Sequence, residues 1–128
     1  MIFKLNGKDV NDFNDVADTL RAGNGYGHAY MVDLRNLTGW KKLSGNIRKE
    51  ISSSLYAVGV GHLPQELPGN QNEEVRLYAL DSRIGEIVAA VLSPSYRGDT
   101  LLQDLVADSS DAGGKLKRIR QILNSPHG

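Results

Sequence analysis

His28-Ala29-Tyr30-Met31-Val32-Asp33-Leu34 is the stretch of sequence on which the predicted fold depends. Its middle residues are apolar at successive positions, so an extended chain would be apolar on both of its faces. Burial on both faces is typical of a central or parallel strand. We therefore expect residues 28–34 to form a buried strand.

The sequence before this strand predicts a hairpin and one helix. Residues 2–5 and 8–10 are short strand candidates, and the Asn6-Gly7 pair between them is the preferred two-residue hairpin turn. Apolar residues then recur at helical spacing over 13–20, with capping residues before them and a glycine after them.

After residue 34, segments with the apolar spacing of a helix alternate with segments that have the spacing of a strand. We expect a helix over 46–56, a strand over 75–80, and helices over 84–92, 100–107 and 114–123. Alternating strands and helices predict an α/β domain with a small three- to four-stranded mixed sheet, crossover helices and a helical C-terminal third. An α+β arrangement is the alternative. We expect one globular domain over residues 1–128.

The composition limits the classes of function. Fifteen basic residues balance fifteen acidic ones, which is unlike a dedicated nucleic-acid-binding protein and leaves no charge repulsion against self-association. There is no cysteine, which excludes disulfides, thiolate metal sites and cysteine nucleophiles. Neither a signal-peptide pattern nor a membrane-length apolar run is visible, so we expect a cytoplasmic protein without membrane contact.

Residues 59–72 form the longest stretch without a recognisable element. Loops longer than roughly 12 to 15 residues are uncommon in compact domains and are often functional. Leu63-Pro64 and Leu67-Pro68 are spaced four apart, and proline favours extended backbone at itself and at the preceding residue. The two leucines either pack on their own domain or insert into a neighbour, so His62, Leu63 and Leu67 are candidate partner-binding residues.

The internal histidines are His28 and His62. A histidine pair could provide acid and base for phosphodiester cleavage, with Arg35 or Arg48 stabilising the transition state, or could bind a metal with Asp33. Asp33 and Arg35 lie at the carboxyl end of the predicted buried strand, where ligands bind in open α/β sheets. His62, Asp33 and Arg35 are therefore the catalytic candidates. No metal motif is present, and a purely structural role for both histidines is the simpler interpretation.

Two further segments can be interpreted either as ordinary structural elements or as binding sites. The glycines of residues 23–27 could approach a phosphate, but they follow a helix, so we expect a helix cap and a turn. The 114–123 helix carries basic residues on one side, which could bind nucleic acid with Lys41, Lys42, Arg48 and Lys49, or could be a solvated face. Its basic residues are Lys115, Lys117, Arg118 and Arg120.

Three functions remain open from the sequence. The first is a small binding or regulatory protein that acts through protein contacts and self-associates, with the 59–72 loop as its contact surface. The alternatives are nucleic-acid binding through the 114–123 helix, and nucleotide binding or phosphodiester cleavage by His62 with Asp33 and Arg35. We expect the binding role rather than an enzyme, and no cofactor is implied.

Overall fold

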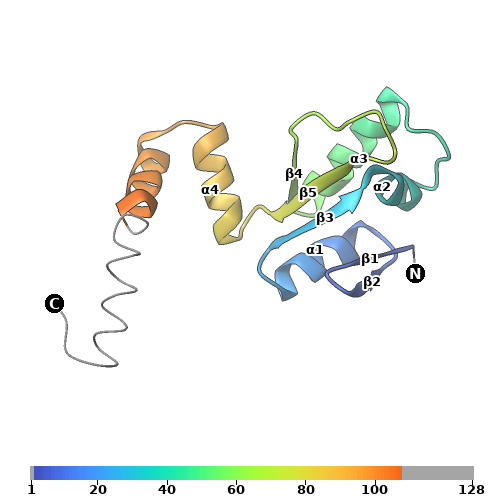
Figure 1. Cartoon of the computed structure of the whole chain (residues 1–128), viewed down its shortest axis with the longest axis horizontal. Helices are drawn as coiled ribbons and strands as arrows, with labels where there is room; N and C mark the ends of the chain where they lie inside the picture. The colour runs from blue at the N-terminus through green and yellow to red at the C-terminus, as the bar shows by residue number, and fades with distance from the viewer. Residues whose placement is uncertain (1, 108–128) are drawn as a thin grey trace. The chain divides into compact units, whose positions relative to one another are not determined.

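The computed structural model describes residues 2–107, and the chain divides into two compact units, residues 1–86 and 87–128. The two units are described separately below, and Figure 1 labels their helices and strands. A single domain over 1–128 stays a prediction. The 114–123 segment, with Lys115, Lys117, Arg118 and Arg120, lies outside the described residues.

The first unit begins with the predicted hairpin. β1 (Phe3–Leu5) pairs antiparallel with β2 (Lys8–Val10), and both Asn6 and Gly7 have positive φ, as a type I′ turn requires. α1 (Phe13–Ala22) follows, with the Asp12 side chain accepting a hydrogen bond from the Asp15 backbone N–H.

A three-stranded antiparallel sheet lies at the centre of the first unit. β5 (Glu74–Ala79) lies between β3 (Tyr26–Tyr30) and β4 (Val60–Leu63) and is antiparallel to both (Figure 1). The α+β form of the predicted fold class is confirmed. The expected parallel pairing is not found in the described residues, because β5 returns between the two strands that precede it. β4 also occupies the start of the segment for which no element was expected.

The expected strand over 28–34 is wrong at its second half. β3 ends at Tyr30, and α2 (Met31–Thr38) begins at the next residue. The Asp33 carboxylate accepts a hydrogen bond from the Tyr30 backbone N–H at 3.3 Å, which favours a helix start here. Ala29 faces the core from a strand, whereas Met31 and Leu34 face it from one side of a helix. Buried positions repeat every second residue in a strand but every three or four residues in a helix. Where the strand passes directly into the helix, the two patterns join into an apolar run that looks like a strand buried on both faces.

α3 (Gly45–Ala57) completes the core, close to the predicted bounds of 46–56. It begins at Ser44, whose hydroxyl accepts from the Ile47 backbone N–H at 3.2 Å. The helices and the hairpin enclose side chains that are at most 1% exposed. The largest of these are Leu5, Leu20, Met31, Leu34, Ile51, Leu55 and Leu77.

Two helices follow the sheet. α4 (Arg83–Leu92) begins after Ser82, whose hydroxyl accepts from the Gly85 backbone N–H at 3.1 Å. A further helix covers 96–107 and begins after Ser95, earlier than the predicted start at 100. In the part of the chain that the structure describes, no helix has the length and apolar character that a membrane crossing requires.

Gly61 and Tyr78 make a close cross-strand contact in the sheet. They are register partners on β4 and β5, and the tyrosine ring lies over the glycine so closely that a Cβ on residue 61 would overlap it. Tyr78 is only 7% exposed. This burial raises the pKa of the Tyr78 phenol above its ordinary value, because the phenolate would lose its hydration.

Replacing Gly61 tests this contact. We expect Gly61→Ala to lower the free energy of unfolding by about 1–3 kcal/mol, because the added methyl group displaces the Tyr78 ring. Gly45→Ala is the control, since a Cβ there meets only the Arg48 side chain at 3.7 Å. Urea unfolding should show a lower free energy of unfolding for Gly61→Ala only. Equal stability of the two variants would contradict the close packing of the Tyr78 ring on Gly61.

The raised pKa of Tyr78 predicts a loss of stability in alkali. Below the ordinary tyrosine pKa of about 10 the contribution of the neutral phenol is fully present, and it is lost as the pH rises through the higher folded-state pKa. The unfolding free energy of the wild type should therefore keep a constant difference from that of Tyr78→Phe up to about pH 9 and fall relative to it as the pH rises above about 10. Parallel pH profiles of the two proteins would show that burial does not affect this phenol.

Candidate functional site

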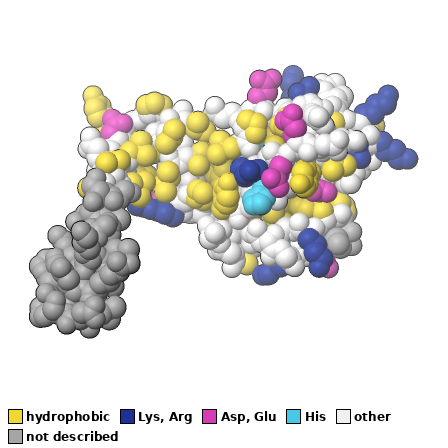
Figure 2. All heavy atoms as spheres, in the orientation of Figure 1, with side chains coloured by type: hydrophobic (Ala, Val, Ile, Leu, Met, Phe, Trp, Pro, Cys, Tyr) yellow, Lys and Arg dark blue, Asp and Glu magenta, His cyan; other side chains and the backbone are white. Residues whose placement is uncertain are grey.

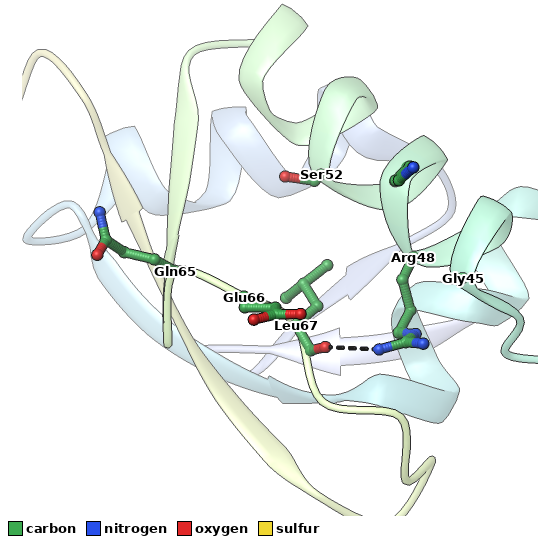
Figure 3. Close-up of a pocket in the computed structure, with 7 residues that line it drawn as sticks. Gly45, Arg48, Ser52, Gln65, Glu66 and Leu67 are labelled. Atoms are coloured by element: carbon green, nitrogen blue, oxygen red, sulfur yellow. Dashed lines mark hydrogen bonds between the residues drawn. The ribbon is translucent and has the colours of Figure 1, made fainter.

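A small cavity lies between α3 and the segment that follows β4 (Figure 3). Its volume is about 230 Å³. Pockets for drug-sized ligands measure roughly 300 to 1,000 Å³, so this one is suited to a single side chain or a small ion. It is lined by Gly45, Arg48, Lys49, Ser52, Gln65, Glu66 and Leu67.

The spacing of residues on α3 brings positive charge to this cavity. Residues 45, 48, 49 and 52 recur at intervals of three or four, which places them on one face of the helix. Arg48 and Lys49 supply two cations beside the positive end of the helix dipole. Across the cavity, Glu66 supplies one carboxylate (Figure 3). None of these three residues takes part in an ion pair within residues 2–107.

The segment that closes the cavity is fastened to the first unit. Leu67 is only 5% exposed and belongs to the core, and its carbonyl oxygen accepts from Arg48 Nη1 at 3.3 Å (Figure 3). Farther along, Gln71 accepts from Arg35 Nη1 at 2.7 Å through Oε1. Leu63 and Leu67 were predicted either to pack on their own domain or to insert into a neighbour, and Leu67 packs on its own domain. Leu63 is half-buried on β4. The side chain of Leu67 is therefore not available to a partner here.

His62 ties β4 to α3 beside the cavity. Its Nδ1 lies 2.8 Å from the Pro64 carbonyl oxygen, and its Nε2 lies 2.7 Å from Ser52 Oγ. A carbonyl can only accept, so the neutral ring carries its proton on Nδ1 and accepts from the serine hydroxyl through Nε2. Both nitrogens of the ring are engaged, which holds the start of the 64–69 segment in place.

No hydrogen bond or ion pair among residues 2–107 joins His62 to Asp33 or Arg35. None of the three lines the cavity beside α3, and a shared catalytic role for them stays a prediction. Asp33 and Arg35 lie on α2 rather than at the end of a strand. His28 is engaged with Glu74 at 3.0 Å on the exposed side of the sheet. No three His, Asp or Glu side chains of the described chain gather where a metal ion could bind.

Basic residues are not concentrated on the surface seen in Figure 2. Basic and acidic side chains are interspersed there, whereas a nucleic-acid interface usually has a basic patch or stripe. Lys41 and Lys42 are exposed, but neither lines the cavity that holds Arg48 and Lys49. Nucleic-acid binding through residues 114–123 stays a prediction, because that segment lies outside the described residues.

A second hollow adjoins the glycine-rich turn. It measures about 430 Å³ and is lined by Asn6, Gly23, Asn24, Tyr26, Gly27 and His28. Gly23 caps α1, and the backbone N–H of Gly25 donates to the Leu20 carbonyl, so the expected helix cap and turn are confirmed. No lysine or arginine lines this hollow, which does not favour a phosphate ligand.

No sequence pattern groups all of the residues that line the first cavity. The sequence indicates Arg48 as a transition-state or nucleic-acid contact and Lys49 as a nucleic-acid contact, and it gives no indication for Ser52 or Glu66. The helical spacing of residues 45, 48, 49 and 52 was a usable signal. The position of Glu66 on the other side of the cavity depends on how the 64–69 segment folds back, and no local sequence pattern reveals this.

No protein-family model, curated protein or solved structure matches the chain. The function has to follow from the two hollows, their charges and their hydrogen-bonding groups.

The packing of Leu67 gives a direct stability test. Leu67→Ala should lower the free energy of unfolding by about 2–5 kcal/mol, because it leaves a cavity in the core. Leu63→Ala is the matched control, and its loss should be smaller because Leu63 is only half-buried. Urea unfolding measures both. A Leu67→Ala variant as stable as the wild type would mean that this leucine does not anchor the segment.

Proposed function

We propose that the protein is a small binding protein that self-associates through the surface around the first cavity. This contact surface consists of Arg48 and Lys49 on α3 together with the 64–69 segment. In the proposed dimer, Glu66 of each copy enters the cavity of the other and faces Lys49. The observation that carries the proposal is that one small surface presents cations and a carboxylate that form no ion pair with any residue of 2–107.

The chemistry of this surface supports a symmetric dimer. A two-fold interface brings the same patch of both copies together, so the patch has to be complementary to itself. A surface with Lys49 on one side of a cavity and Glu66 on the other meets this condition, since each lysine meets the opposite glutamate. A cavity of about 230 Å³ also has room for one carboxylate side chain.

The rigidity of the contact surface lowers the entropy that association would cost. Leu67 is buried, its carbonyl is held by Arg48, and His62 is held at both ring nitrogens. A surface already fixed in the free chain loses little freedom on binding. The zero net charge of the chain adds no long-range repulsion between copies. The lack of cysteine fits our further proposal of a cytoplasmic location, where disulfides are rare.

Charge reversal tests the proposed pairing. Lys49→Glu and Glu66→Lys should each weaken the dimer by at least about tenfold, because each places like charges together. The double variant should restore association, since it re-forms the pair with its charges exchanged. Lys42→Glu is the control, as Lys42 is exposed and lies outside the cavity lining.

Size-exclusion chromatography with light scattering measures the result over a range of protein concentrations. The proposal requires a wild-type dimer, weakened by each single reversal and restored by the double one. A wild type that stays monomeric at every concentration would overturn it. So would a double variant that associates no better than the single ones.

A further inference from the structure

The open edge of β3 presents unused hydrogen-bonding groups beside the second hollow. Gly25 accepts from the Ala79 backbone N–H, and Met31 donates to Glu73, so the odd-numbered residues between them face β5. Backbone groups of an antiparallel strand alternate in direction, so the even-numbered residues face away from the sheet. Asn6 Nδ2 confirms this by donating to the Tyr26 carbonyl at 3.0 Å. The N–H and C=O of His28 therefore point to the open edge.

Two amide side chains add one donor and one acceptor to the same hollow. Asn24 uses Oδ1 to accept from the Tyr26 backbone N–H at 3.1 Å, and an N–H can only donate, so its NH₂ group is the end without a hydrogen-bond partner among residues 2–107. Asn6 gives its NH₂ group to the Tyr26 carbonyl, so its Oδ1 is the corresponding unused end within the same residues. The chemistry of the partners thus fixes both amide orientations.

Two aromatic rings border these groups. The Tyr26 and His28 ring centroids are 6.4 Å apart, and the planes are tilted by 60°. A flat ligand that stacks on one ring would meet the other at an angle, a favourable arrangement for aromatic groups. The His28 ring is held by the Glu74 carboxylate at 3.0 Å, so this wall is fixed.

We infer that the second hollow is a binding site for a neutral planar heterocycle of the nucleobase type. A nucleobase offers a donor and an acceptor side by side on its edge, which match the N–H and C=O of His28, and a flat face that stacks on Tyr26 or His28. The lining contains no lysine or arginine, so recognition depends on the ring and not on a phosphate. The volume of about 430 Å³ is sufficient for a nucleoside.

Adenosine and adenosine monophosphate are suitable probes, with binding followed by the amide NMR signals of residues 23–28. Adenosine should shift these signals, and the monophosphate should bind no more tightly. Asn24→Asp keeps the oxygen that accepts from Tyr26 but removes the free donor, so it should weaken adenosine binding by at least about tenfold. Tyr26→Leu should weaken binding as well, whereas Tyr56→Leu, at a tyrosine that is 72% exposed on α3, should have no effect.

Each contrary result overturns the inference. The site does not exist if millimolar adenosine leaves the amide signals of residues 23–28 unmoved. Adenosine binding that is unchanged in Asn24→Asp and in Tyr26→Leu would place the ligand elsewhere. Ribose 5-phosphate that shifts the same signals without a base would make the hollow a phosphate site instead.

Discussion

The pairing of β5 with a strand on each side is the constraint on which the rest of the first unit depends. Val75, Leu77 and Ala79 of this strand are fully buried, and its backbone joins β3 to β4. Because β5 fills the centre, β3 keeps one open edge, and β4 is followed by the 64–69 segment, which Arg48 of α3 holds at the Leu67 carbonyl. One candidate site lies at the open edge of β3, and the other lies between α3 and the 64–69 segment.

The two sites differ in their chemistry, and this difference separates their proposed ligands. The cavity beside α3 has two cations and one carboxylate, and its walls are held by Leu67 and by the hydrogen bonds of His62. The hollow beside β3 has amide groups, backbone groups and two rings, but no lysine or arginine. Charged groups with no ion-pair partner favour a charged partner, whereas a neutral lining with paired donors and acceptors favours a neutral ring.

Local signals in the sequence predicted the elements whose ends are set by neighbouring residues. The Asn6-Gly7 turn, the cap of α1 (Asn11 or Asp12 from the sequence, Asp12 in the structure) and the apolar spacing of α3 are of this kind. The boundary at Tyr30 could not be found from periodicity, because Ala29, Met31 and Leu34 are all buried although the backbone changes from strand to helix between them. β4 was missed because Val60 and Leu63 flank a glycine and a histidine, and their pairing with β5 is non-local. For the same reason, the helical spacing of residues 45, 48, 49 and 52 could reveal the cationic face of α3 but not Glu66 opposite it.

The most direct test of self-association through the first cavity is zero-length carbodiimide cross-linking of an equal mixture of unlabelled and isotope-labelled chains. Mass spectrometry of the digested products shows which lysines and carboxylates are joined and whether the two ends come from different chains. The proposed dimer predicts a Lys49–Glu66 cross-link between a labelled and an unlabelled chain. A Lys49–Glu66 product formed only within single chains, or cross-links between chains that involve only other residues, would contradict the proposed contact.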